Sequence, residues 1–355
     1  MSQGSALIER FDAVLSDLDG VVYAGAGAIS GAPEALQGCV DRGIKVAFIT
    51  NNASRSPQQV AEHLQELGTP ATSQTVFGSA DAGVQLLVEE VRQLGKTPET
   101  LGTVLIAGSS YLEQQAQAAG FQTIRAKDAD GHASFGAVIQ GFDPSLSWLD
   151  LANASYAINR GAFWVATNTD FTIPRAEGIA PGNGALVNAV AMATKHRPVV
   201  AGKPEPVMFH QAAASLHAQS PVVVGDRLDT DIRGGNAAGI PTVLVLTGID
   251  TVETALGSVT QERPTFIIAT LQDFFVPYEE PQKVAENGLD FWTCGPWTAT
   301  FEASNDSITI TGGSRDVATS DVRAWRAACA AYWESKVEQR ESHVPQLKFP
   351  VKVSM

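Results

Sequence analysis

The chain lacks long apolar runs, has few cysteines and carries little positive charge. None of its 355 residues lies in an uninterrupted apolar stretch long enough to cross a bilayer, so no membrane partner is expected. Residues 1–10 lack the basic and apolar regions of a secretory signal. Three widely spaced cysteines, Cys39, Cys294 and Cys329, exclude a disulfide framework. These absences predict a cytoplasmic protein.

The charge balance is strongly acidic. A net charge of −14 argues against a nucleic-acid partner, because phosphate backbones require a basic surface. For the same reason a phosphorylated substrate would need a local cationic site. With 44% hydrophobic and 17% charged residues, the composition is that of a globular protein, and the length suits two or three domains.

Short apolar strands alternate with helical stretches along most of the chain. A first β-α-β-α-β series predicts a doubly wound parallel sheet. Its strands are expected at 11–16, 44–50 and 75–78, and its helices at 32–42 and 57–67. A second α/β block interrupts this series, with strands at 103–108, 136–141 and 163–167, helices at 111–119, 149–160 and 185–194, and a Gly/Pro-rich connection at 174–184. The first series resumes with strands at 199–201, 221–224, 240–246 and 265–268.

The pattern changes beyond about residue 276. Residues 278–281 are expected to be a linker. Segments 297–302 and 307–311 alternate in polarity around a turn, which predicts a hairpin. Ser320 could cap the helix that follows. The predicted fold is therefore an α/β core with an inserted α/β domain and a small α+β C-terminal domain.

Two carboxylates one residue apart follow the first strand, in Asp17-Leu18-Asp19-Gly20. In an extended backbone, residues i and i+2 point to the same side. Adjacent carboxylates repel each other unless a cation lies between them or one keeps its proton. The pattern therefore predicts a metal site, an acid/base pair, or both. A polar turn with solvated acids is the alternative.

Three other strand ends carry polar groups that suit the same site. They are Thr50-Asn51-Asn52, Lys203 within Gly-Lys-Pro-Glu-Pro, and the acidic run from Asp226 to Asp231. Each alone is also explained as a turn, a helix cap or a solvated side chain. Together they offer carboxylates, neutral donors and an ammonium, which phosphoryl transfer with Mg²⁺ requires.

In this combination and order, the motifs resemble those of the haloacid dehalogenase superfamily of phosphatases. Further matches are Tyr23 and the segments 29–34 and 166–170, so the resemblance covers about residues 11–275. It is closest to the branch with a large inserted cap, which includes NagD-like, phosphoglycolate, pyridoxal-phosphate and glycerol-phosphate phosphatases. The resemblance implies a discontinuous core at 1–79 and 184–275 and a specificity cap at 80–183.

The resemblance also implies roles for the acids. Asp17 would be the nucleophile that forms an aspartyl-phosphate. Asp19 would protonate the leaving alcohol, then act as base for the hydrolytic water. Mg²⁺ would be bound by the side chains of Asp17 and Asp226 and by the main-chain carbonyl of Asp19. Asp231 would hold the metal's waters or the side chain of Lys203 in position without binding the metal itself.

Neutral donors and one ammonium are the implied phosphate ligands. Thr50 and the Asn51 amide would hold phosphate oxygens, with Asn52 in the same run of donors, and Lys203 would offset negative charge. Substrate contacts below the cap are expected from Asn168 and Asp170, for which a turn-shaping role is an equal alternative.

The C-terminal block, residues 281–355, resembles the tail of actinobacterial glycerol-3-phosphate phosphatases, which is similar to part of a GCN5-type (GNAT) acetyltransferase fold. It is too short for a whole acetyltransferase and lacks the loop that binds coenzyme A, so a packing, dimerisation or regulatory module is expected. A second copy of the chain is thus a candidate partner. Glycerol 3-phosphate is the expected substrate, followed by 2-phosphoglycolate, then nucleoside monophosphates or sugar phosphates.

Two other classes of function use similar residues. A signalling receiver domain also phosphorylates an aspartate with Mg²⁺, a threonine and a lysine, but needs neither an inserted cap nor Asp19. A metabolite-sensing protein could keep the phosphatase fold without turnover, although the complete catalytic set argues against it.

Overall fold

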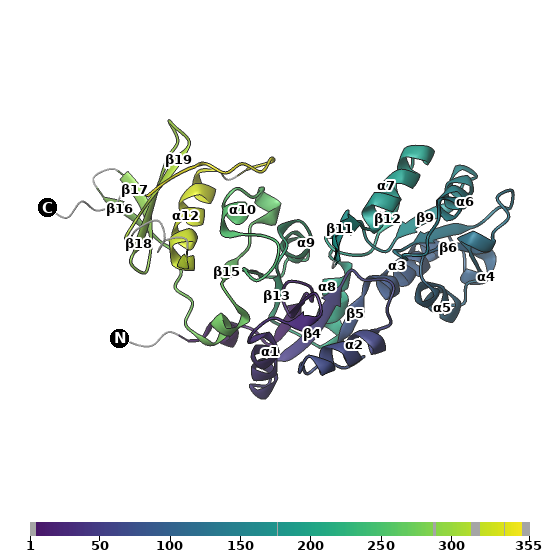
Figure 1. The fold of residues 1–355 in the computed structure, drawn as a ribbon, viewed down its shortest axis with the longest axis horizontal. Helices are drawn as coiled ribbons and strands as arrows, with labels where there is room; N and C mark the ends of the chain where they lie inside the picture. The colour runs from purple at the N-terminus through teal and green to yellow at the C-terminus, as the bar shows by residue number, and fades with distance from the viewer. Residues whose placement is uncertain (1–4, 176, 287–288, 314–319, 337, 350–355) are drawn as a thin grey trace. The chain divides into compact units, whose positions relative to one another are not determined.

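The computed structural model describes residues 5–175, 177–286, 289–313, 320–336 and 338–349. The chain forms two compact units (Figure 1). The first comprises Met1–Ala24, Ala28–Lys45 and Gln219–Met355, and the second comprises Gly25–Gly27 and Val46–Ala218. Among the described residues, no helix has both the length and the apolar character needed to cross a membrane.

Four parallel strands in the order β15-β14-β13-β1 form the sheet of the first unit. Val14 pairs with Val222, and Val224 pairs with Val243. Nearly every residue of these strands is buried, as a parallel sheet covered on both faces requires. The bounds are β1 (Ala13–Ser16), β13 (Pro221–Gly225), β14 (Thr242–Val245), β15 (Phe266–Ile268), α1 (Ala32–Asp41), α9 (Arg233–Ala237) and α10 (Val252–Leu256), with short strands β2 (Tyr23–Ala24) and β3 (Gly27–Ala28) and 3₁₀ turns η1 (Leu7–Arg10), η4 (Thr260–Glu262) and η5 (Leu271–Phe275).

The described part of the C-terminal domain contains a five-stranded sheet, in the strand order β16-β17-β18-β19-β20, and the helix α12. The predicted hairpin is confirmed, because β18 and β19 pair antiparallel with Phe301 opposite Ile308. Asp321 rather than Ser320 caps the helix, since its side chain accepts from the main-chain N–H of Arg323. The bounds are β16 (Gln282–Glu286), β17 (Leu289–Cys294), β18 (Trp297–Glu302), β19 (Ser307–Thr311), α12 (Val322–Ser335) and β20 (Gln346–Lys348).

The segment expected to be a linker, 278–281, is anchored at its first residue. The ring of Tyr278 lies edge-on to Phe266 at 5.0 Å between centroids, and the guanidinium of Arg326 lies 3.8 Å from its centre. Arg326 also donates two hydrogen bonds to the Ile267 carbonyl, at 3.0 and 2.8 Å. The C-terminal domain is therefore bound to the last strand of the parallel sheet by specific contacts.

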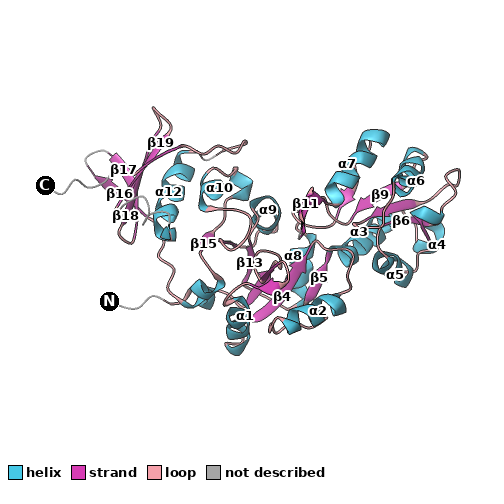
Figure 2. Cartoon of the chain, viewed as in Figure 1, coloured by secondary structure: helices cyan, strands magenta, loops and turns pink. Residues whose placement is uncertain are grey.

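The second unit contains a parallel strand pair, β4 and β5, and a five-stranded sheet in the order β12-β9-β8-β6-β7. Figure 2 shows β6 and β9 of this sheet with the helices around it. Helices α3 and α5 cover one face of the larger sheet, and α6 and α7 cover the other. The strands are β4 (Lys45–Thr50), β5 (Val76–Gly78), β6 (Val104–Ala107), β7 (Thr123–Arg125), β8 (Ala137–Gln140), β9 (Phe163–Ala166) and β12 (Val199–Val200). The helices are α2 (Pro57–Glu66), α3 (Ser79–Gln93), α4 (Pro98–Leu101), α5 (Ser110–Ala118), η2 (Ala126–Asp128), α6 (Trp148–Asn159), α7 (Asn183–Thr194) and α8 (Val207–Ser215).

Parts of this unit differ from the sequence-based expectation, which included neither helix α3 nor strand β7. The Gly/Pro-rich connection contains a hairpin, β10 (Thr172–Arg175) and β11 (Gly178–Pro181). The strand expected to resume the first series, β12, instead pairs with β9 of the five-stranded sheet, with Val199 opposite Val165.

Candidate active site

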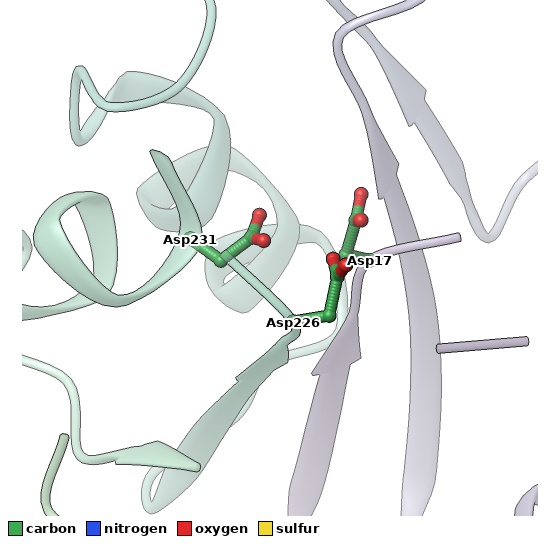
Figure 3. A group of neighbouring side chains, drawn as sticks. All are labelled: Asp17, Asp226 and Asp231. Carbon is green, nitrogen blue, oxygen red and sulfur yellow. The ribbon is translucent and has the colours of Figure 1, made fainter. Parts of the chain in front are cut away.

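Three carboxylates converge in the first unit (Figure 3). One oxygen each of Asp17, Asp226 and Asp231 lies within 4.8 Å of the other two. Asp17 follows β1, Asp226 follows β13, and Asp231 belongs to the π-helical turn η3 (Leu228–Ile232). Asp226 and Asp231 are each only 1% exposed. Buried carboxylates this close to one another repel strongly, so the arrangement indicates a cation site.

The backbone around Asp226 holds its carboxylate in place. Its Oδ2 accepts from the main-chain N–H of Ile249 at 2.7 Å. Gly20 and Gly248 lie directly against the same carboxylate, and a Cβ at either position would overlap it. Gly20 also has φ +79°, so this turn requires glycine for two reasons. On the neighbouring turn, Asp231 Oδ2 accepts from the Arg227 N–H at 3.2 Å.

The Asp19 side chain is not one of the three clustered carboxylates. Strand β1 ends at Ser16, and the chain then turns, with the Leu18 carbonyl accepting from Val22 N–H at 2.8 Å. The alternation of an extended strand therefore does not extend to Asp19. Its Oδ2 accepts a 3.3 Å hydrogen bond from the Tyr23 hydroxyl.

In the second unit, Asn51 links three of the predicted motifs. Its Oδ1 accepts from the main-chain N–H of Lys203 at 2.9 Å. Its Nδ2 donates to Asp170 Oδ1 at 2.9 Å and to the Lys203 carbonyl at 3.1 Å. Its own carbonyl accepts from the Asn168 side chain at 2.7 Å and from Ser79 Oγ at 2.6 Å. The end of β4, the turn after β9 and the Lys203 loop are thus held together through one asparagine.

Burial and local bonds define the remaining predicted residues of this unit. Lys203 is 3% exposed, and its Nζ donates to the Ile49 carbonyl at 3.4 Å. Thr50 is also buried, and its Oγ1 accepts from Asn52 N–H at 3.1 Å. Asn52 shapes the following turn, because its Oδ1 accepts from both the N–H and the hydroxyl of Ser54 at 2.8 Å.

Two polar residues of this network were not predicted from the sequence. Asn183 donates to the Asn168 carbonyl at 2.7 Å, and Ser79 bonds the Asn51 carbonyl. Both residues start a helix, so they resemble ordinary helix-capping residues in the sequence, and their partners are distant in the chain.

Comparison with known proteins agrees with the fold and with these motifs. A haloacid dehalogenase-like hydrolase profile matches residues 14–122, and a HAD-hydrolase-like profile matches residues 200–274. The D-glycerol 3-phosphate phosphatase of Mycobacterium tuberculosis is 40% identical over 262 residues, which cover 74% of this chain and 70% of that protein. A 5'-nucleotidase of Bacillus subtilis is 33% identical over 273 residues, 76% of this chain and 100% of that protein.

Solved structures extend the comparison. The glycerol phosphate phosphatase of M. tuberculosis in complex with calcium superposes with a TM-score of 0.79 at 32% identity, covering 98% of this chain and 96% of that one. An NPPase of Geobacillus stearothermophilus reaches 0.64 at 32% identity, covering 74% of this chain and 98% of that one. The chain belongs to the haloacid dehalogenase-like hydrolase family. It is a phosphatase.

Mg²⁺ is the cofactor that fits the carboxylate cluster. The donors of Asp17, Asp226 and Asp231 are all oxygens, and Mg²⁺ is usually held by one or two carboxylates together with water and phosphate oxygens. The M. tuberculosis phosphatase was also solved in complex with magnesium. Bound there, Mg²⁺ would neutralise the clustered carboxylates and the substrate phosphate.

Proposed function

We propose that this phosphatase hydrolyses glycerol 3-phosphate to glycerol and inorganic phosphate. The carboxylate cluster at the ends of β1 and β13 is the observation that carries the chemistry, because it combines an acid positioned for attack with a cation site. The substrate is inferred from the relative that is 40% identical and named for D-glycerol 3-phosphate.

The acids after β1 would carry out both chemical steps. A carboxylate oxygen of Asp17 attacks phosphorus, and the bond from phosphorus to the glycerol oxygen breaks. Asp19 donates its proton to that departing oxygen. Asp19 then takes a proton from water, whose oxygen attacks the same phosphorus and releases phosphate from Asp17. The Tyr23 hydroxyl bonded to Asp19 would orient this carboxylate.

Neutral donors and one ammonium would bind the phosphoryl group, as the resemblance implies. The side chain of Asn51 is committed to Lys203 and Asp170, so we assign phosphate binding to the Asn51 main-chain N–H and the Thr50 hydroxyl. The ammonium of Lys203 would offset the negative charge that builds on the phosphoryl oxygens. Asp170 and Asn168 act in this proposal through Asn51, as positioning residues.

The extent of structural similarity supports the glycerol ester over its rivals. The M. tuberculosis glycerol phosphate phosphatase aligns with 98% of this chain, whereas the NPPase aligns with 74%. The C-terminal domain is therefore included in the first alignment. Nucleoside monophosphates are the second candidate substrates. They are favoured by the similarity to a 5'-nucleotidase, whose whole length matches 76% of this chain.

We also propose the domain assignment of the resemblance, with a catalytic core at 1–79 and 184–275, a specificity cap at 80–183 and a non-catalytic C-terminal domain at 281–355. The boundary at 184 needs one change, because β12 belongs to the five-stranded sheet of the cap and α7 packs on that sheet. The similarity of the C-terminal domain to GCN5-type folds remains a prediction. So do a homodimeric state, a cytoplasmic location and the absence of a nucleic-acid partner.

Phosphate release from a panel of esters tests the substrate. The full chain is assayed with glycerol 3-phosphate, 2-phosphoglycolate, nucleoside monophosphates and sugar phosphates, with Mg²⁺ or with EDTA. We expect the highest kcat/KM for glycerol 3-phosphate and no turnover in EDTA. A preference for another ester would overturn the substrate, and turnover in EDTA would overturn the role of the carboxylate cluster.

A further inference from the structure

Gln140 is a fully buried amide at the end of a central strand. It is the last residue of β8 and is 0% exposed. Neither its Oε1 nor its Nε2 has a hydrogen-bond partner within the described part of the chain. A buried amide without partners is strongly unfavourable, so this position indicates that a polar atom of a bound molecule, here called the guest, lies beside it.

Two other buried polar groups lie on the same face of this sheet. Trp164 of β9 pairs with Val138, and Val138 lies two residues before Gln140 on β8. The side chains of Trp164 and Gln140 therefore project to the same face, which α6 and α7 cover. The Trp164 Nε1–H is buried and has no partner among the described residues. Because the register makes Trp164 a diagonal neighbour of Gln140, the indole can reach it.

Asn183 approaches this face from the first turn of α7. It lies one helical turn before Val187, which packs in the same apolar cluster as Trp164. Its Nδ2 is bonded to the Asn168 carbonyl, which fixes the orientation of the amide. The Asn183 Oδ1 is buried and has no partner in the described ranges, and the residue is 1% exposed.

The chemical types of these groups are complementary. Gln140 Nε2 and Trp164 Nε1 are donors, whereas Gln140 Oε1 and Asn183 Oδ1 are acceptors. We propose that Gln140, Trp164 and Asn183 form a binding site for one hydroxyl-type oxygen, which accepts from the two donors and donates to both acceptors if it is a water, or to one of them if it is a hydroxyl. An O–H group is the chemical class that meets both needs, and buried waters typically make about three such bonds.

The site lies close to residues that the mechanism uses. Strand β8 lies between β9 and β6. Asn168, just after β9, donates to the Asn51 carbonyl, and Ser109, just after β6, donates to the Ala53 carbonyl. Both carbonyls belong to the segment that follows β4. The guest oxygen could therefore come from a structural water or from a hydroxyl of the substrate. The second source rests on the proposed function, whereas the first does not.

High-resolution crystal structures of the full chain, with and without glycerol 3-phosphate, distinguish the sources. An oxygen within about 3.2 Å of Gln140 and of Trp164 Nε1 or Asn183 Oδ1 in both crystals identifies water. Such an oxygen that belongs to glycerol 3-phosphate and is seen only in the complex identifies a substrate hydroxyl. Crystals in which all three groups bond protein atoms, or in which no oxygen is present, overturn the proposal whatever the enzyme's substrate is.

The direction of the stability change in Gln140→Leu gives an independent test. If a guest is bound, the substitution removes the amide that holds it, and the Trp164 and Asn183 groups lose their hydrogen-bond partner. The midpoint of thermal unfolding then falls. Without a guest, it removes an unfavourable buried amide, and the midpoint rises. Gln114→Leu on the exposed face of α5 is the matched control. A higher midpoint for Gln140→Leu than for wild type, both without ligand and with saturating glycerol 3-phosphate in EDTA, overturns the site.

A double-mutant cycle tests the shared guest. Trp164→Phe should lower the midpoint too, whereas Trp148→Phe, at a tryptophan 77% exposed, should not. Gln140→Leu combined with Trp164→Phe should lower it by less than the sum of the single effects, because either change alone displaces the same oxygen. Additive effects would show that the two residues share no guest.

Discussion

The contact between Gly20 and the Asp226 carboxylate gives a sharp test of the cation site. A Cβ at Gly20 would overlap that carboxylate, and its φ of +79° also strains any other residue. Gly43 has the same φ of +79°, yet a Cβ there would meet nothing within 4 Å. Gly20→Ala and Gly43→Ala therefore carry the same backbone strain and differ in the effect on Asp226.

The expected loss of stability follows from the backbone. A left-handed conformation costs an alanine about 1–2 kcal/mol. The stiffer unfolded chain returns about 0.4–1 kcal/mol. Urea unfolding should therefore show a net loss of about 1 kcal/mol in the free energy of unfolding for Gly43→Ala, and at least that loss for Gly20→Ala.

The two variants should separate in their need for Mg²⁺. Displacing a carboxylate that binds the metal should weaken Mg²⁺ binding at least about tenfold, the lower end of what changes around metal ligands produce. The assay is phosphate release at increasing Mg²⁺, together with direct titration of Mg²⁺ by calorimetry. If Gly20→Ala needed no more Mg²⁺ than Gly43→Ala, Asp226 would not be a metal ligand.

Two further predictions concern buried titratable groups. Burial raises the pKa of Asp81, whose carboxylate accepts a hydrogen bond from the Tyr111 hydroxyl. The stability that a protonated Asp81 contributes is fully present below the pKa of this residue in the unfolded chain. It is lost as the pH rises through the higher pKa of this residue in the folded chain. Asp81→Asn should thus raise the unfolding midpoint at pH 7, with a gain that disappears toward about pH 4; no gain at pH 7 would contradict this. Burial also raises the pKa of the Cys39 thiol to about 12 and of Cys294 to about 11, and raises that of Cys329. A thiol reagent at pH 8 should label no cysteine in the folded chain and all three after denaturation, and rapid labelling of the folded chain would refute this.

Local patterns in the sequence were sufficient to predict most strands of both α/β sheets. Apolar runs such as the one ending at Ser16 have few alternatives to a buried strand. The polar residues that follow two of these runs, Asp17 and Asp226, belong to the carboxylate cluster, whereas Asp231 was expected only to support the metal's waters or a lysine. The C-terminal hairpin was also predicted, because its polarity alternates around an obvious turn.

What the sequence did not predict depends on partners distant in the chain. Helix α3 was missed, although it is 15 residues long. The partner of β12 could not be predicted, because a two-residue strand carries no register information. Asn183 bonds a carbonyl 15 residues away, and Tyr278 packs on Arg326, and neither contact leaves a local pattern.

The most direct test of the central claim is to trap the covalent intermediate. The full chain is mixed with glycerol 3-phosphate and Mg²⁺, quenched in acid within a turnover, digested and examined by mass spectrometry. The account predicts a phosphoryl group on the peptide that contains Asp17, and neither the adduct nor phosphate release in Asp17→Asn. A phosphoryl group on another residue, or full turnover by Asp17→Asn, would contradict it.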